Sequence, residues 1–231
     1  AENTAIIFTS DHGEMLGERG MWFKKHFFEP ALRIPLILKL PQDMPRRVET
    51  PVSLLDLLPT LMGIAEGTGW DDAVEPLAGT DLTALLTAPP DLNRLIFAEY
   101  LAEATPSPLI MIREGHHKFI WSKHDPVMLF DLKADPNEQI NIAQKPEQSE
   151  VVAMFEALIH AHWDINELQD RIVQSQKRRR LILDGYAFGK KPRWNHDETP
   201  DEQVIWYRGE QGYNDWAFSF LPSKLTDVSS G

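Results

Sequence analysis

A short apolar run, Thr4–Thr9, ends directly on the polar sequence SDHGE, and this junction constrains the fold more than any other feature of the chain. The β-branched residues of the run are typical of a buried strand. In α/β proteins the loops that follow strands carry the chemistry, because a rigid strand holds their side chains in place. We therefore expect an α/β region around this strand, with Asp11 and His12 at its end.

Composition excludes several classes of protein. The 231 residues are 42% hydrophobic, which is enough for a sizeable core, and they carry a formal net charge of −12. Nucleic acid and anionic membrane surfaces are poor partners for such a chain, since both attract basic faces. The basic run Lys177–Arg180 lies in a helical pattern and is typical of a solvated helix face. No apolar stretch reaches the roughly 18 residues that span a bilayer and no signal peptide is visible, so we expect a cytoplasmic protein.

Residues 1–90 have the pattern of the end of an α/β domain. The apolar runs Thr4–Thr9 and Ile34–Leu40 predict two strands. A leucine-rich helix follows, with Ser53 as its possible N-cap, and Pro59 implies a kink or a late start of this helix. The first strand resembles a central strand buried on both faces, which needs neighbours. We therefore expect the chain to be the later part of a longer polypeptide.

The rest of the chain predicts two further regions. Over residues 91–184, four strand-like runs separated by turn residues predict an antiparallel sheet, and one or two helices follow from residue 148. Residues 185–231 form a tail that is too rich in aromatic residues for a disordered linker.

Asp11 and His12 are candidate metal ligands. On a straight strand two adjacent side chains point to opposite faces, but at a bend into a loop both can turn toward one centre. The alternative is that Asp11 caps the following turn and His12 is an ordinary polar residue, since short motifs often match by chance. The residues that follow favour a site, because three glycines allow tight turns and Lys24 lies twelve residues after His12.

The chain resembles the second half of sulfatases of the alkaline phosphatase superfamily, over roughly residues 4–145, through SDHGE-x-LGE-x-G, FFEPALRIPL, VSLLDLLPTLMGIA and LFDLKADPNEQINIA in this order. Several motifs in the right order are more specific than any one of them. The chain is most similar to the choline sulfatases, through GERGMWFKKHFFEPALRIPL and the tail segment NHDETPDEQVIWYRGEQGYNDWAFSF. The resemblance implies the C-terminal part of an alkaline-phosphatase-like α/β sandwich, a smaller α+β subdomain with an antiparallel sheet, and a long C-terminal tail.

The same resemblance implies roles for residues near the first strand. Asp11 and His12 would complete a divalent-metal site, with Ca²⁺ as the ion that the family implies, although an imidazole ligand is unusual for so hard an ion and keeps Mn²⁺ or Mg²⁺ open. Lys24 would contact the sulfate or the leaving-group oxygen, with Lys25 as the alternative, and we count His12 with Lys24 among the catalytic residues. A metal ion and an ammonium group at that oxygen stabilise negative charge as it develops.

The chain contains no cysteine. Sulfatases of this kind use a cysteine converted to formylglycine as the nucleophile, so the resemblance implies that an N-terminal part of the same sulfatase carries it, together with two acidic metal ligands. We expect the chain alone to be inactive. We also expect the complete enzyme to act on a small-molecule sulfate ester and to form a homo-oligomer, either a tetramer or a dimer.

The tail contains candidate residues for recognising choline, a quaternary ammonium ion that calls for aromatic faces and a carboxylate. Asp215, Trp216 and Tyr213 offer both, and the alternative is that these aromatic residues only attach the tail to its own domain. Glu99, near the end of a strand-like run, is a further candidate for substrate binding. By contrast, we expect His116–Lys118 to begin a strand and to carry no site.

Two other functions stay open at this point. Phosphonate monoester and phosphodiester hydrolases of the same superfamily use a similar Asp–His pair. A non-catalytic binding or assembly module would keep the fold without the nucleophile, and the lack of cysteine favours it if the 231 residues are the whole gene product.

Overall fold

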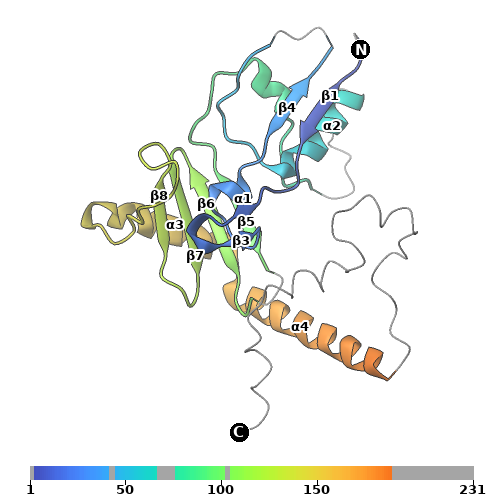
Figure 1. Ribbon diagram of the computed structural model, residues 1–231. Helices are drawn as coiled ribbons and strands as arrows, with labels where there is room; N and C mark the ends of the chain where they lie inside the picture. The colour runs from blue at the N-terminus through green and yellow to red at the C-terminus, as the bar shows by residue number, and fades with distance from the viewer. Residues whose placement is uncertain (1–2, 42–44, 67–75, 102–104, 189–231) are drawn as a thin grey trace. The chain divides into compact units, whose positions relative to one another are not determined.

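The computed structural model describes residues 3–41, 45–66, 76–101 and 105–188 (Figure 1). The strands are β1 (Ile6–Thr9), β2 (Met15–Leu16), β3 (Trp22–Phe23), β4 (Leu36–Lys39), β5 (Ile96–Tyr100), β6 (Leu109–Glu114), β7 (His117–Ser122) and β8 (Met128–Asp131). The α-helices are α1 (Glu29–Leu32), α2 (Leu57–Glu66), α3 (Ser149–His162) and α4 (Ile165–Ala187). The 3-10 helices are η1 (Glu18–Gly20), η2 (Leu54–Asp56), η3 (Leu82–Leu86) and η4 (Pro146–Gln148).

The chain divides into two units, residues 1–178 and 179–231. Of the second unit, the structure describes residues 179–188, which contain the last turns of α4. There Arg180 Nε and Asp184 Oδ1 lie 3.1 Å apart, one helical turn from each other. The domain boundaries at residues 90 and 184 stay predictions.

In the described part of the chain, the strands pair only antiparallel. β1 pairs with β4, and the short strands β2 and β3 pair with each other. The strands β5 to β8 form a four-stranded sheet in sequence order, which confirms the antiparallel sheet predicted after residue 90. Both strands predicted in the first region also form, but each is shorter than its apolar run.

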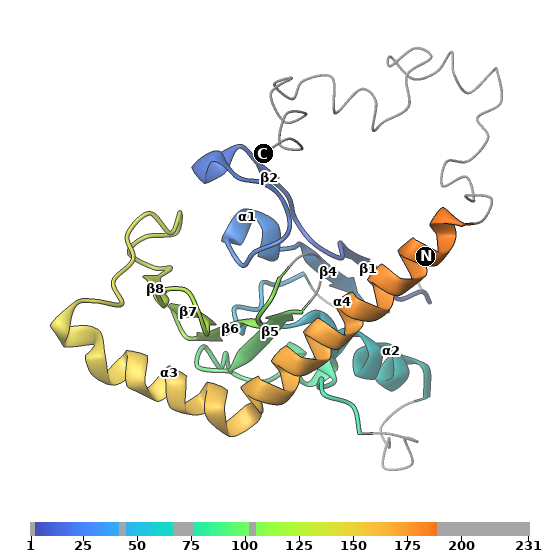
Figure 2. The same cartoon turned by 90° about the horizontal axis from the view of Figure 1, so that it is seen from below.

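The four-stranded sheet has a hydrophobic core on each face, and Figure 2 shows α3 and α1 on opposite sides of it. On the α3 side, the rings of Phe119 and Phe155 stack with centroids 5.3 Å apart. The buried residues of this core are Ile110, Ile112, Phe119, Trp121, Leu129, Phe155, Ile159 and Ile165. On the α1 side the buried residues are Met15, Phe27, Phe28, Ala31, Met111, Ile120 and Phe130. Strand residues alternate between the two cores, as the period of a strand requires.

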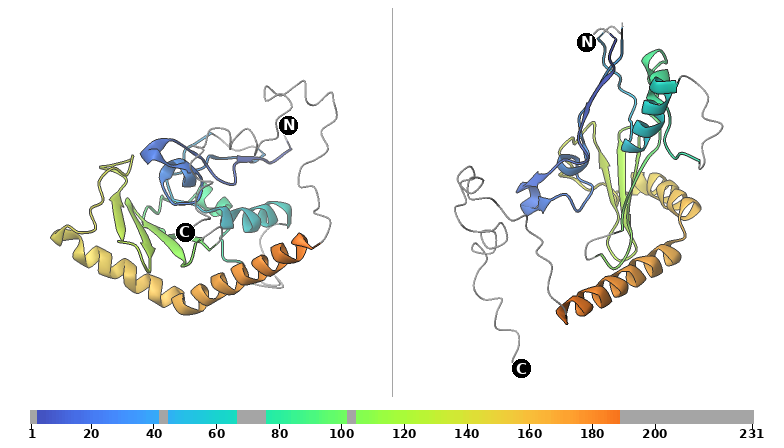
Figure 3. Two further views of the ribbon diagram at one scale, coloured as in Figure 1. Left: turned by 60° about the horizontal axis from the view of Figure 1, so that its bottom comes forward. Right: turned by 90° about the vertical axis from the view of Figure 1, so that its right-hand side faces the viewer.

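The ribbon formed by β1 and β4 is separate from this sheet and has much less cover (Figures 1 and 3). The sequence predicts a strand buried on both faces, but Phe8 on β1 is 60% exposed and Ile37, its partner on β4, is 61% exposed. Pairing satisfies the backbone hydrogen bonds along one edge of each strand but buries neither face of the ribbon. The apolar side chains of one face are therefore exposed to solvent in this chain.

Helix α2 begins later than its leucine pattern suggests. Ser53 caps the preceding turn η2, because its Oγ accepts the N–H of Leu55 while Asp56 accepts the N–H of Ser53. The predicted N-cap is thus confirmed, and Pro59 lies in the first turn of α2, where its missing N–H costs no helical hydrogen bond. Asp56 is buried and receives two hydrogen bonds, at 2.7 and 2.9 Å, from the guanidinium of Arg94.

The helical segment after residue 148 is two helices. Helix α3 ends at His162, and the carboxylate of Asp164 then caps α4 by accepting the N–H groups of Asn166 and Glu167, each at 3.0 Å. Among the residues that the structure describes, no helix is both long and apolar enough to cross a bilayer.

Candidate active site

The end of β1 presents Asp11 and His12 on a loop that α1 holds in place. The N–H of Gly13 donates to the carbonyl of Ala31 at 2.7 Å, and the N–H of Glu14 donates to the carbonyl of Pro30 at 2.9 Å. A side chain at Gly13 would overlap the Pro30 carbonyl, so only glycine permits this close approach. The loop is thus fixed directly after the two candidate ligands.

The hydrogen bonds of His12 define the roles of its two ring nitrogens. Nδ1 lies 2.6 Å from the carbonyl oxygen of Gly13, which can only accept, so Nδ1 carries the hydrogen. Nε2 lies 2.7 Å from Lys24 Nζ, which donates, so Nε2 presents its lone pair. Asp11 Oδ2 is 3.3 Å from the same Nε2. The structure therefore brings together the three residues predicted for the metal and for catalysis.

Asp11 is poised to act as a carboxylate. Desolvation acts to raise the pKa of its side chain, but the hydrogen bond from the N–H of His12 at 3.0 Å, together with that from the Ser10 hydroxyl, outweighs it. The pKa of Asp11 is consequently lowered from its ordinary value, and the ionised, metal-binding form is favoured.

A cavity of about 510 Å³ lies over these side chains. Both Lys24 and Glu99 line it, as do two arginines that the sequence pattern did not single out, Arg33 and Arg113. The lining residues come from the end of β1, the segment from Lys24 to Leu36, the turn before α2, strand β5, and Met111 and Arg113 of β6. The lining thus combines cationic groups, the carboxylates of Asp11, Glu29 and Glu99, and apolar side chains.

His26 is a further lining residue of this cavity. Its Nδ1 accepts the N–H of Phe28 at 3.4 Å, and its Nε2 is buried without a hydrogen-bond partner among the residues that the structure describes. Burial lowers the pKa of His26, and the charges of Arg19 and Lys118 lower it further. The ring is therefore kept neutral beside the cavity.

Glu99 lines the cavity, and its carboxylate accepts a hydrogen bond of 2.8 Å from the indole Nε1 of Trp163. Its neighbour on the strand, Tyr100, packs with the core on the α1 side of the sheet. The role of Glu99 in substrate binding stays a prediction. Asp215, Trp216 and Tyr213 lie outside the described residues.

Asp11 and His12 are the candidate metal ligands that the structure places together. Among the described residues, no three His, Asp or Glu side chains gather where they could hold a metal ion. Asp11 and His12 offer one carboxylate and one imidazole lone pair at the same strand end, and this donor pair fits part of a divalent-metal site.

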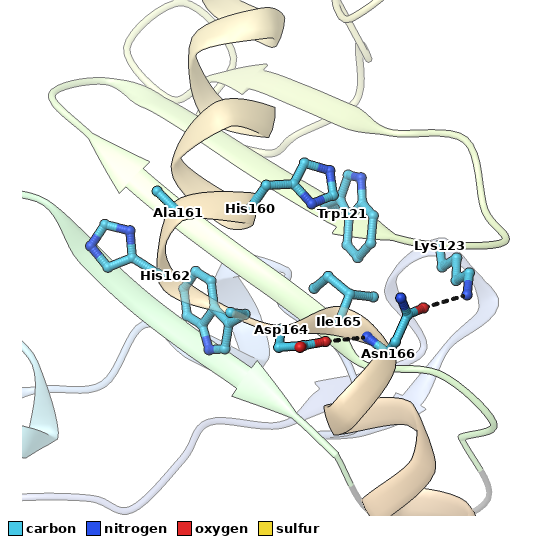
Figure 4. Close-up of a pocket in the computed structure, with 9 residues that line it drawn as sticks. Trp121, Lys123, His160, Ala161, His162, Asp164, Ile165 and Asn166 are labelled. Carbon is cyan, nitrogen blue, oxygen red and sulfur yellow. Dashed lines mark hydrogen bonds between the residues drawn. The ribbon is translucent and has the colours of Figure 1, made fainter.

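A second hollow, at the junction of α3 and α4, is a structural feature (Figure 4). It measures about 490 Å³ and shares no lining residue with the cavity at Asp11. The rings of Trp121 and His160 meet edge to face, and Lys123 donates to Asn166 at 3.2 Å, which ties the end of β7 to the start of α4.

Comparison with known proteins finds similarity to sulfatases. Residues 1–68 match the family model described as Sulfatase. The chain is 38% identical to the choline-sulfatase of Rhizobium meliloti over 199 residues, which cover 84% of this chain and 38% of the relative. The chain thus spans about two fifths of the length of this relative.

Solved structures show the same fold. A 2-O GAG sulfatase superposes with a TM-score of 0.56 at 25% identity, over 78% of this chain and 38% of that one. The phosphonate monoester hydrolase of Silicibacter pomeroyi superposes with a TM-score of 0.59 at 28% identity, over 70% of this chain and 35% of that one. The fold is accordingly part of an alkaline-phosphatase-like α/β architecture, and on these matches the chain belongs to the sulfatase family.

Proposed function

We propose that this chain supplies one side of the active site of a sulfate ester hydrolase whose substrate is choline O-sulfate and whose products are choline and sulfate. The observation that carries the proposal is the contact of Lys24 Nζ with His12 Nε2 at 2.7 Å, beside Asp11 and open to the cavity. The choice of choline O-sulfate is supported by the choline-sulfatase of Rhizobium meliloti, the relative that is 38% identical.

In this proposal, Lys24 acts on the oxygen that leaves. A sulfate monoester carries one negative charge, and when the ester bond breaks the bridging oxygen becomes anionic. An ammonium group aimed at that oxygen stabilises it most in the transition state, so it raises turnover more than it tightens binding. Lys24 is preferred over Lys25 because Lys24 lines the cavity and contacts His12.

Asp11 and His12 would hold a divalent metal ion through one carboxylate oxygen and Nε2, and the ion would take the Nε2 lone pair from the Lys24 ammonium, which would then be free to donate to the ester. When bound, such an ion supplies positive charge that polarises the sulfate group. The hydrogen bond from Nδ1 to the Gly13 carbonyl fixes the imidazole orientation and directs the Nε2 lone pair away from the backbone. The family resemblance favours Ca²⁺, with Mn²⁺ or Mg²⁺ as alternatives that suit the imidazole ligand.

The nucleophile and the remaining metal ligands would come from the N-terminal part of the same enzyme, docked on the β1–β4 ribbon. This partner is proposed because Ile6, Phe8 and Ile37 expose apolar surface at the strand that leads into the site. A covered ribbon would place the partner's residues next to Asp11 and His12, which end the same strand.

A phosphonate or phosphate ester is the second candidate substrate, because the chain is 28% identical to a phosphonate monoester hydrolase of the same fold. Such esters carry similar anionic oxygens, and a lysine with a metal ion serves both reactions. The complete enzyme should therefore be assayed with choline O-sulfate and with a phenylphosphonate monoester. A higher kcat/KM for the phosphonate would replace the first proposal with the second.

The metal site is tested by Asp11→Asn and His12→Ala in the complete enzyme. Each removes one of the two ligands that this chain offers, so bound metal, measured by elemental analysis, and turnover should fall together. Ser10→Ala is the matched control, because Ser10 Oγ contacts Asp11 and His12 only through hydrogen bonds and offers the metal no charge. Full metal occupancy in both ligand variants would overturn the assignment. Reloading the stripped wild type with Ca²⁺, Mn²⁺ or Mg²⁺ identifies the ion.

A further inference from the structure

A buried cluster of charged side chains joins the four-stranded sheet to α1. Lys118 on β7 is 0% exposed, and its Nζ lies 2.6 Å from Glu29 Oε1, 2.7 Å from Glu138 Oε1 and 2.8 Å from the carbonyl oxygen of Phe27. An ammonium group donates three hydrogen bonds, and these oxygens take all three. Because a buried charge is costly unless it is fully paired, the cluster favours a single arrangement of its parts.

Glu138 makes a second contact with α1, in addition to the ion pair between Lys118 and Glu29. Its Oε2 accepts the backbone N–H of Glu29 at 2.7 Å, while its Oε1 holds Lys118. Glu138 has a φ of +55°, which is unusual for a residue with a side chain, and its own N–H donates to the carbonyl of Asp135. The turn after β8 therefore directs this carboxylate onto the first residue of α1.

Two segments of the candidate active site lie next to α1 along the chain or in space. We call them arms: one contains Asp11 and His12, and the other contains Lys24. The arm with Asp11 and His12 is bonded to the carbonyls of α1 through Gly13 and Glu14. The arm with Lys24 continues to Phe27, two residues before α1 begins, and the carbonyl of Phe27 accepts a hydrogen bond from Lys118. The position of α1 on the sheet consequently sets where the two arms meet, and Figure 2 shows α1 between the sheet and these loops.

The other buried ion pair of the described residues, Asp56 with Arg94, differs in this respect. Its hydrogen bonds hold Ser53 and Thr80 and the carbonyl of Pro51, and none of them touches α1 or either arm. That pair stabilises a turn. The Lys118 cluster lies one hydrogen bond away from the backbone of both arms.

We propose that Lys118, through Glu29 and Glu138, is a positioning residue that sets the distance between the arm with Asp11 and His12 and the arm with Lys24, and thereby the placement of the Lys24 ammonium against the leaving oxygen. The proposal rests on the proposed function for the role of Lys24. Lys118 itself touches no substrate, because it is fully buried beneath α1.

The test is Lys118→Met in the complete enzyme, since methionine has a similar length and no hydrogen to donate. Misplacement of a catalytic group by about 1 Å lowers turnover by about 100-fold. We expect a loss of this size in kcat for choline O-sulfate, whose alkoxide leaves poorly, with little change in KM. For 4-nitrophenyl sulfate, whose leaving group needs little help, the loss should be much smaller.

A double-mutant cycle with Lys24→Ala separates positioning from general damage. If Lys118 acts through Lys24, adding Lys118→Met to Lys24→Ala should change kcat by no more than about twofold. A further loss as large as that in the wild type would overturn the positioning role and leave the proposed function standing. If Lys24→Ala alone lowers kcat equally for both esters, the role of Lys24 fails, and the positioning role fails with it.

Two variants guard against loss of folding. Glu138→Gln keeps the size of the side chain but can satisfy only one of its two partners, so it should give a milder loss with the same preference for choline O-sulfate. Phe155→Leu is the matched control in the core on the other face of the sheet. It should lower Tm without any preference between the esters. Equal losses on both esters in Glu138→Gln would contradict the proposal.

Discussion

The four-stranded sheet and the β1–β4 ribbon are built from similar apolar strands, but they differ in how far their apolar side chains are buried. In the sheet, Phe119 and Ile120 point to opposite faces and both are buried, because α3 covers one face and α1 the other. In the ribbon, Phe8 and Ile37 are each exposed over more than half of their surface. Similar apolar sequences are thus buried on both faces in the sheet and exposed on one face in the ribbon.

The two regions also differ in the role of their residues. The sheet completes its core within the chain and provides Lys118 and Glu138 as fixed points for α1. The ribbon carries Asp11 and His12 at its end and, in our proposal, completes its core only with a partner. Thus the part with a core on both faces supports α1, and the part with an exposed face carries the candidate ligands.

The largest effect is expected in the sheet. Phe155→Ala removes a ring that stacks on Phe119 in a fully buried core, so the free energy of unfolding should fall by about 3–5 kcal/mol. Urea unfolding of this chain, followed by circular dichroism, measures the change. A loss below about 1 kcal/mol would mean that the core on the α3 side is not the stable part of the chain.

An intermediate effect is expected at the substrate. If Asp215 pairs with the trimethylammonium group, Asp215→Asn in the complete enzyme should lower kcat/KM for choline O-sulfate by roughly ten- to a hundredfold, since one charged contact is worth about 1–3 kcal/mol. A neutral aryl sulfate should lose far less. Glu99→Gln tests the rival carboxylate on the sheet, which is already engaged by Trp163. Equal losses of the two esters in Asp215→Asn would assign the tail a structural role.

The smallest effect is expected in the ribbon of this chain alone. Phe8→Ser replaces a side chain that is already solvated, so the free energy of unfolding should change by no more than about 0.5 kcal/mol. In the complete enzyme, the same substitution should lower Tm clearly, because the side chain would then be buried against the partner. An equally small change in both proteins would show that nothing covers the ribbon.

The sequence predicted the parts of the fold that depend on local pattern. The antiparallel sheet follows from alternating runs and turn residues, and the start of α2 follows from Ser53 and Pro59. Local pattern could not show that the strand Ile6–Thr9 would be exposed on one face. Burial of that face depends on neighbours beyond the strand itself, and the type of an apolar residue does not reveal whether it is buried or exposed.

For the candidate site, the sequence likewise predicted the residues that lie close together along the chain and missed those that lie far apart. Asp11, His12 and Lys24 were found because they are close in sequence and match a family pattern, and the structure brings them together. Lys118 was expected to carry no site, yet it meets Glu29 and Glu138, residues 89 and 20 positions away along the chain. Such a cluster has no local signature, since each member alone resembles an ordinary surface charge.

The glycine at position 13 makes the tolerance of this region to mutation very uneven. Most side chains from Glu14 to Lys25 are exposed, so substitutions there meet mainly solvent, except at the buried Met15 and at Gly17 and Gly20, whose positive φ favours glycine. At Gly13 a single methyl group would press on the Pro30 carbonyl and part the loop from α1, the helix that follows the Lys24 segment along the chain. One added carbon atom would therefore displace the proposed metal ligands and the proposed catalytic lysine in the same event.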